Sequence, residues 1–225
     1  YDQNGQVSGA TNSFLTLNGL VPADAGNYYC KATNTCGDDQ SNNISLTINE
    51  APAITSNTQD ATRCEGQGMS FGITATGTNP VNYQWYHDGN SIGGASSSNY
   101  NINVVDTNSE GFYYCVASNT CGSATSNIIK LTIDKAPEVA NISDSATACE
   151  GNNIVLSASA TGTAPISYQW YYNTSPVQGA VNSFYLINDI ELGNAGNYTC
   201  KAYNHCGFAY SNPINVLVNS PVGLT

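Results

Sequence analysis

The chain has 225 residues, a formal net charge of −11 and only five lysines and arginines. Those scattered cations argue against nucleic acid as a partner, because phosphate binding needs clustered Lys and Arg, and no apolar run approaches the roughly 20 residues that span a bilayer. A hydrophobic content of 40% is enough for packed cores, and eight cysteines indicate an oxidising compartment.

The predicted elements, in chain order, are short strands. They are expected at 69–75, 83–86, 100–105, 111–115, 131–133, 154–160, 168–171, 184–190, 196–200 and 216–218. The runs alternate in side-chain character and are separated by turn residues, and none has helical periodicity. About seven short strands in each ~85 residues predict an all-β, two-sheet sandwich.

An internal repeat of 85 residues organises these strands. The recurring positions are Cys30, Cys115 and Cys200; Cys36, Cys121 and Cys206; Cys64 and Cys149; and Trp85 and Trp170. We therefore expect a partial domain at 1–49, full domains at 50–134 and 135–219, and the start of a further unit at 220–225. A joint such as Asp134-Lys135-Ala136-Pro137 leaves almost no linker, which favours restricted hinge motion.

Two groups of residues resemble immunoglobulin domains. The run Asp24-Ala25-Gly26-Asn27-Tyr28-Tyr29-Cys30 is similar to the tyrosine corner, in which a Tyr hydroxyl ties the start of strand F to the backbone just upstream. The equivalent tyrosines are Tyr28, Tyr113 and Tyr198. Trp85 and Trp170 look like the buried strand-C tryptophan of the I-set-like fold.

A narrower resemblance rests on Cys64-Glu65-Gly66 and on Ser118-Asn119-Thr120-Cys121-Gly122. These motifs are similar to the tandem immunoglobulin-like repeats of large surface adhesins in Bacteroidota-type bacteria, many of which are exported by the type IX route. The resemblance covers the whole chain. It implies an extracellular or cell-surface location and a role in attachment or in gliding-type surface filaments.

The cysteines depart from the immunoglobulin pattern, in which strands B and F are bridged across the core. The 85-residue step places Ile73 and Ala158 at the strand-B positions, so Cys115 and Cys200 lack their usual partners. If Cys64 pairs with Cys206, the three strand-F cysteines would be small buried thiols. These thiols are Cys30, Cys115 and Cys200.

Cys64 has three candidate partners: Cys115, Cys121 and Cys206 of the next unit. The I-set-like arrangement that the resemblance implies puts the turn before strand B and the F–G turn at opposite ends of a domain. This favours a Cys64–Cys206 bridge across a joint, with the other two pairings left open. Under that bridge, the remaining cysteines would pair with units outside this chain; these are Cys36, Cys121 and Cys149.

Catalytic and metal sites have little support in the sequence. The two histidines lie in different repeats, and a single His-Cys pair with Cys200 offers only three zinc ligands at His205, Cys206 and Cys200, whereas zinc sites prefer four. Paired carboxylates at Asp38-Asp39 are interpreted as a solvated turn. No cofactor is expected, although calcium at the joints is an alternative; its candidate ligands are Glu65, Asp134 and Glu150.

Three features that we expect to be exposed bear on function. Phe208 and Tyr210 form a candidate carbohydrate- or protein-binding patch, because Ser123 and Thr125 stand at their positions in the preceding repeat; ordinary surface variation is the alternative. Ser145, in Asp144-Ser145-Ala146, resembles an O-glycosylation signal of Bacteroidota-type surface proteins. Asn-x-Ser/Thr sequons, which matter only in a eukaryotic secretory route, occur at Asn43, Asn141, Asn173 and Asn197.

These observations favour a non-enzymatic structural and adhesive role. The chain would be a stalk or filament segment of a large secreted surface protein, contacting neighbouring repeats and assembling with further copies. The alternatives are a glycan- or protein-binding module, and a spacer attached to a secreted hydrolase.

Overall fold

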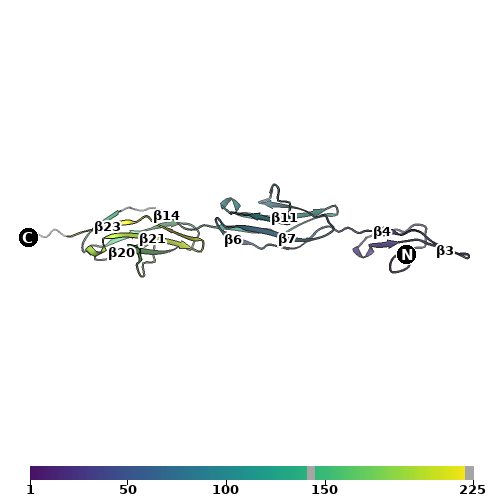
Figure 1. Cartoon of the computed structure of the whole chain (residues 1–225), viewed down its shortest axis with the longest axis horizontal. Coiled ribbons are helices and arrows are strands. Elements are labelled where there is room, and N and C mark those ends of the chain that lie inside the picture. The colour runs from purple at the N-terminus through teal and green to yellow at the C-terminus, as the bar shows by residue number, and fades with distance from the viewer. Residues whose placement is uncertain (141–144, 221–225) are drawn as a thin grey trace, which may run out of the picture. The chain divides into compact units, whose positions relative to one another are not determined.

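A computed structural model describes residues 1–140 and 145–220. This part of the chain is built from short β-strands, as Figure 1 shows, and the expected all-β class is confirmed. Its helical elements are three single 3₁₀ turns: η1 (Pro22–Asp24), η2 (Thr107–Ser109) and η3 (Leu192–Asn194). Three expectations fall on residues outside the described ranges: the start of a further unit after Ser220, the sequon at Asn141, and Asp144 of the O-glycosylation signal.

The chain divides into two compact units whose boundaries cut across the repeat at 50–134. The first unit contains residues 1–58, 71–100 and 113–128, and the second contains 59–70, 101–112 and 129–225. The middle repeat therefore contributes strands to both units.

In the first unit, two small antiparallel pairs come from residues 1–49. They are β1 (Gly26–Tyr28) with β4 (Ile44–Leu46), and β2 (Lys31–Asn34) with β3 (Gly37–Gln40). The middle repeat adds β5 (Ala53–Asn57) against β7 (Met69–Thr76). It also adds β8 (Asn82–His87), which pairs with β9 (Asn90–Ser91) and β11 (Gly111–Asn119), and β12 (Gly122–Thr125), which pairs with β11. Three strands cross the unit boundary, because the first two residues of β7 and of β11 and the last two of β10 (Asn99–Ile102) belong to the second unit.

The second unit contains the C-terminal sandwich. One sheet runs in the order β15 (Ser145–Cys149), β23 (Ile214–Asn219), β21 (Gly196–Asn204), β18 (Ser167–Tyr172) and β19 (Ser175–Pro176), with β22 (Gly207–Tyr210) also paired to β21. The other strands are β14 (Glu138–Ala140) with β17 (Ser159–Thr161), and β16 (Ile154–Ser157) with β20 (Phe184–Ile187). The middle repeat contributes two strands that pair in parallel, β6 (Ala61–Cys64) near its start and β13 (Ile129–Asp134) at its end.

The two tryptophans are fully buried centres of packing. Trp170 shares one apolar cluster with Leu156, Tyr198 and Cys200, and its indole Nε1 donates to the Asn182 carbonyl at 3.0 Å. In the first unit Trp85 donates in the same way to the Ser97 carbonyl at 2.9 Å. Burial of a large apolar ring together with a satisfied N–H explains why tryptophan occupies both positions.

The tyrosine corner is present at both ends of the chain. The Tyr28 hydroxyl donates to the Asp24 carbonyl at 2.8 Å, and the Tyr198 hydroxyl donates to the Asn194 carbonyl at 3.0 Å. Burial raises the pKa of Tyr198 to about 12. Tyr113 is equally buried, and its ring stacks on Phe71 with centroids 4.3 Å apart.

The expectation that Cys30 is a buried core residue is wrong. Cys115 and Cys200 are fully buried, and burial raises the pKa of both thiols to about 11, but Cys30 is exposed. Cys200 is buried because it packs in one core with Leu156 of β16. Residues 1–49 contain no strand equivalent to β16, so nothing equivalent packs over Cys30.

Candidate functional site

The joint between the last two repeats has no free linker residue. Asp134 ends β13, and its carbonyl accepts a hydrogen bond from the Glu65 amide of the same repeat at 2.8 Å. The next residue, Lys135, is already tied to the following repeat: its amide donates to Thr163 Oγ1 at 2.8 Å, and its carbonyl accepts from the Thr163 amide at 3.1 Å. Asp134 is therefore hydrogen-bonded within its own repeat and Lys135 within the next repeat, with no residue between them.

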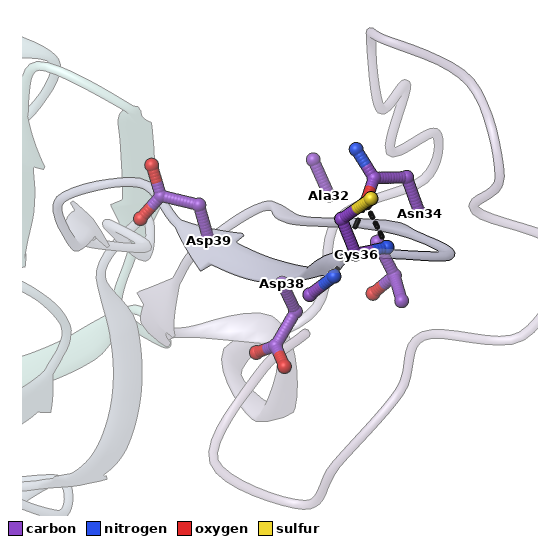
Figure 2. A pocket seen from close by; sticks show the side chains of 7 residues that line it. Ala32, Asn34, Cys36, Asp38 and Asp39 are labelled. Atoms are coloured by element: carbon purple, nitrogen blue, oxygen red, sulfur yellow. Dashed lines mark hydrogen bonds between the residues drawn. The ribbon is translucent and has the colours of Figure 1, made fainter.

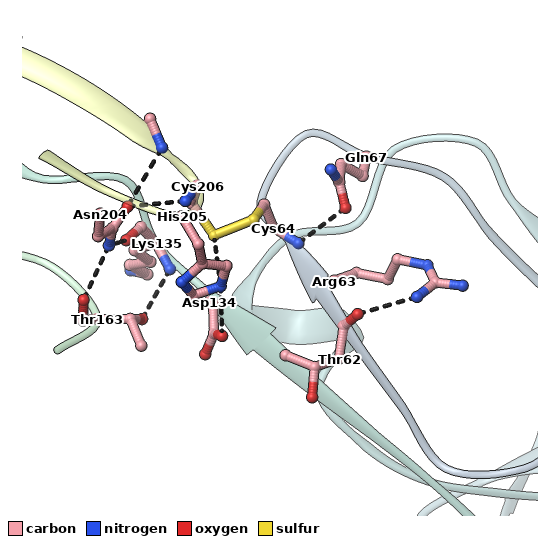
Figure 3. Close-up of a disulfide and its surroundings, with 11 residues drawn as sticks. Thr62, Arg63, Cys64, Gln67, Asp134, Lys135, Thr163, Asn204, His205 and Cys206 are labelled. Carbon is pink, nitrogen blue, oxygen red and sulfur yellow. Dashed lines mark hydrogen bonds and ion pairs between the residues drawn. A yellow bond between two sulfur atoms is a disulfide. The ribbon is translucent and has the colours of Figure 1, made fainter. Parts of the chain in front are cut away.

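An asparagine in the F–G turn reinforces this attachment. Asn204 Nδ2 donates to the carbonyls of Lys135 at 2.7 Å and Thr163 at 2.8 Å, while its Oδ1 accepts from the amides of Cys206 and Gly207. One side chain thus connects the first residue of the repeat to two of its turns, as Figure 3 shows in part. We call Lys135, Thr163 and Asn204 the joint clamp.

The preceding joint contains the same clamp. Asn119 Nδ2 donates to the carbonyls of Glu50 at 2.7 Å and Thr78 at 2.9 Å, and the Glu50 amide donates to Thr78 Oγ1 at 2.9 Å. The two joints therefore share their residue types and bonds, apart from the exchange of Glu50 for Lys135.

A disulfide crosses the second joint. Cys64, the last residue of β6, is bonded to Cys206 in the F–G turn of the next repeat, with Cα atoms 5.4 Å apart (Figure 3). This is the pairing that the sequence favoured. The alternative partners, Cys115 and Cys121, are free thiols, the first buried and the second exposed.

His205 adds a polar contact beside the disulfide that the sequence did not reveal. Its Nε2 lies 3.0 Å from the Asp134 carboxylate and 3.3 Å from Cys206 Sγ. Ligand-type atoms of Cys64, His205 and Cys206 come within 4.8 Å of one another. Because the two sulfurs are bonded to each other, they carry no thiolate that could bind a metal in this state.

The candidate calcium ligands named as an alternative are not gathered into one cluster in the described part of the chain. Asp134 faces His205 instead, and Glu65 contributes its backbone amide to the joint. The exposed thiols Cys36, Cys121 and Cys149 are free in the structure, and their pairing with further units stays a prediction.

Asp38 and Asp39 lie in strand β3 and not in a turn as expected, and their side chains point to opposite sides of it, as Figure 2 shows. Asp38 pairs with Lys31 at 2.8 Å, while Asp39 Oδ1 accepts from the Gln40 amide. The hollow of about 570 Å³ beside them is also lined by Ala32, which is exposed although its counterparts Ala117 and Ala202 are fully buried. The hollow is therefore an uncovered core surface rather than an acid–base site.

The C-terminal repeat presents aromatic side chains on the solvent side of its larger sheet. Register places Tyr203 opposite Phe208 and Lys201 opposite Tyr210 on neighbouring strands. These rings remain well exposed, at 42% for Tyr203, 60% for Phe208 and 51% for Tyr210. We call Tyr171, Lys201, Tyr203, Phe208 and Tyr210 the aromatic face.

Lys201 lies at the centre of this face. Its Nζ is 4.4 Å from the Phe208 ring centroid, 5.7 Å from that of Tyr203 and 5.9 Å from that of Tyr210. All three distances fall within the roughly 6 Å range of cation–π attraction. Phe208 and Tyr171 each meet Tyr210 edge-on, so the sequence-predicted pair belongs to a larger cluster.

The comparisons with known proteins agree with this architecture. The family model described as "Immunoglobulin domain" matches residues 137–218, and a second model with the same description matches residues 51–119. This chain belongs among the immunoglobulin-domain proteins. It carries two such domains in tandem, as the repeat predicted.

Curated relatives are animal proteins with much longer chains. The chain is 26% identical over 198 residues to Neuroglian of Drosophila melanogaster, covering 82% of this chain and 15% of that protein. It is 28% identical over 222 residues to the human Leucine-rich repeats and immunoglobulin-like domains protein 3, covering 91% of this chain and 20% of that protein. A further relative, from Xenopus laevis, is named as cell adhesion molecule-related; it is 23% identical, over 89% of this chain and 19% of that protein.

Solved structures support the fold. The titin I-band fragment I67–I69 superposes with a TM-score of 0.68 at 20% identity, covering 89% of this chain and 76% of that one. The insect immune protein hemolin gives a TM-score of 0.54 at 20% identity, covering 89% of this chain and 58% of that one. Within residues 1–140 and 145–220, the structure contains no helix with the length and hydrophobicity needed to cross a membrane.

Proposed function

We propose that this chain is a structural and adhesive segment of a large secreted cell-surface protein, in which successive immunoglobulin domains are held in a fixed relation by their joints. The observation that carries the proposal is the second joint, where the Cys64–Cys206 disulfide bridges the two repeats and the joint clamp fixes Lys135, the first residue of the C-terminal repeat. A chain of this kind transmits position from one domain to the next instead of acting as a flexible tether.

The finer parts of the proposal rest on the sequence motifs. They are an origin in a Bacteroidota-type surface adhesin, export by the type IX route, assembly with further copies, and pairing of Cys36, Cys121 and Cys149 with additional repeats. The role as a non-enzymatic module is supported by the relative named as cell adhesion molecule-related, although another relative is named Peroxidasin homolog and the chain covers only 14% of it.

Residual dipolar couplings of the whole chain test the fixed joint. We expect the couplings of residues 51–134 and 135–219 to fit a single alignment tensor in the oxidised protein. In Cys206→Ser, the two repeats should need separate tensors or show reduced order for one repeat. Separate tensors in the oxidised wild-type chain would overturn the proposal, because the joint would then hinge despite the disulfide.

A further inference from the structure

The aromatic face differs from the equivalent surfaces of the other two repeats. In the middle repeat the positions of Lys201, Tyr203, Phe208 and Tyr210 are occupied by Val116, Ser118, Ser123 and Thr125. Their backbone setting is the same, because β11 and β12 pair in the register of β21 and β22. The aromatic residues are therefore not needed to form this sheet.

The first repeat provides the more telling comparison. Lys31 and Asp38 stand at the positions of Lys201 and Phe208, and their side chains form an ion pair at 2.8 Å. In the C-terminal repeat, Phe208 replaces the carboxylate, and no described residue forms an ion pair with Lys201. One of only five Lys and Arg residues in a chain of net charge −11 is thus held among aromatic rings without an anion.

A shallow hollow adjoins the face. Tyr171, Thr174, Thr199 and Tyr210 line a space of about 280 Å³, just below the roughly 300–1,000 Å³ of ordinary small-molecule sites. Its rim contains Thr174 at φ +78°, where the middle repeat has Gly89 at φ +80°. A β-branched residue in the left-handed region is strained, and such strain clusters at functional sites.

We propose that the aromatic face binds an acidic glycan, with one pyranose ring on Phe208 and Tyr210 and its carboxylate at Lys201. A pyranose offers an apolar face of C–H groups that packs on an exposed ring, while its hydroxyls reach the Tyr and Thr hydroxyls at the rim. The unpaired ammonium supplies the complementary charge. A peptide added to the sheet would instead use main-chain groups at a strand edge, whereas Lys201, Tyr203, Phe208 and Tyr210 present their side chains on the sheet face.

The proposal rests on the adhesive part of the proposed function, and its test does not involve the joint. Amide chemical shifts of the whole oxidised chain would be followed during titration with a hyaluronan hexasaccharide, which carries glucuronate. Chitohexaose serves as the neutral glycan of equal length, and hexaglutamate as the acidic peptide. We expect shifts confined to β18, β21, β22 and the turn after β18 that contains Thr174, a dissociation constant on the order of 1 mM because the site is shallow, and at least tenfold weaker binding of both controls.

Three variants carry residues that this chain already uses at the equivalent positions, so each should fold. Phe208→Asp rebuilds the ion pair of the first repeat and should weaken hyaluronan binding at least tenfold. Tyr210→Thr should weaken both glycans. Lys201→Val should weaken the acidic glycan to the level of the neutral one and leave the neutral one unchanged.

Several results would overturn the proposal. They are no binding by the wild-type chain, equal binding of chitohexaose or hexaglutamate, shifts elsewhere on the chain, or unchanged affinity in Phe208→Asp with native spectra. None of these outcomes alters the dipolar couplings across the joint, so failure here and failure of the stalk role are distinguishable.

Discussion

The Cys64–Cys206 disulfide closes a covalent ring that passes through two repeats. If the C-terminal repeat unfolds while the middle repeat stays folded, the roughly 70 residues from Lys135 to Cys206 must form a closed loop, and chain entropy then destabilises the unfolded state by about 4 kcal/mol. The segment from Cys64 to Asp134 has nearly the same length, so the middle repeat gains a similar amount. We therefore predict that Cys206→Ser lowers the free energy of unfolding of the C-terminal repeat by about 4 kcal/mol.

Urea unfolding can measure this loss repeat by repeat, because each of the two repeats contains one tryptophan. Fluorescence of Trp170 in a Trp85→Phe background should show the urea concentration at the unfolding midpoint falling by roughly 2–3 M. This figure takes the free energy of unfolding to fall by about 1.5 kcal/mol per M urea. Cys121→Ser is the matched control, since Cys121 is the counterpart of Cys206 and is free and exposed. An unchanged midpoint in Cys206→Ser, or an equal fall in the control, would refute the reasoning.

Three further predictions concern the clamp, the tyrosine corner and the thiols. Asn204→Asp keeps the Oδ1 acceptor but loses both Nδ2 donations, so urea unfolding should show a loss of about 1–3 kcal/mol; no loss would mean that the clamp contributes nothing. Tyr198→Phe should lower stability by about 1 kcal/mol. Because burial raises the Tyr198 pKa to about 12, the wild-type chain should keep its stability below the unfolded pKa near 10 and lose it as pH rises toward 12, a loss that should be smaller in Tyr198→Phe. Iodoacetamide should label the native chain at its exposed thiols and spare Cys115 and Cys200, because burial raises the pKa of both buried thiols to about 11. Mass spectrometry would follow the labelling, and labelling of Cys200 as early as the exposed thiols would contradict this prediction. The exposed thiols are Cys30, Cys36, Cys121 and Cys149.

The sequence predicted the strands that bury large side chains, and missed the short strands at the sheet edges. The runs around Trp85 and Trp170 alternate clearly and became β8 and β18. By contrast, β6 and β15 are short and pair in parallel with β13 and β23, which lie far along the chain. Such pairing is decided by tertiary contacts, so local alternation carries little signal for it.

The candidate site was likewise predictable only in part. The 85-residue register and the implied domain ends were enough to favour Cys64–Cys206, because a disulfide joins two residue types that are visible in the sequence. The clamp was not predictable in this way. Asn204 binds two main-chain carbonyls, and any residue at those positions would offer the same acceptor.

The three repeats thus separate two kinds of position. Positions at the joints recur. Asn119 and Asn204 make the same bonds, and Gly77 and Gly162 both adopt positive φ. A Cβ added at either glycine would lie about 3 Å from the backbone of the Ala-Pro pair at the start of the same repeat. Solvent-facing positions on the sheet change freely, from Asp38 to Ser123 to Phe208. Because stability in a tandem array is approximately the sum of unit and neighbour-interface terms, a substitution on the sheet face leaves the joints intact. A repeat can therefore acquire a ligand surface without altering how its neighbours hold it. This is why the aromatic face can be specific to the C-terminal repeat while the same clamp is present at both joints.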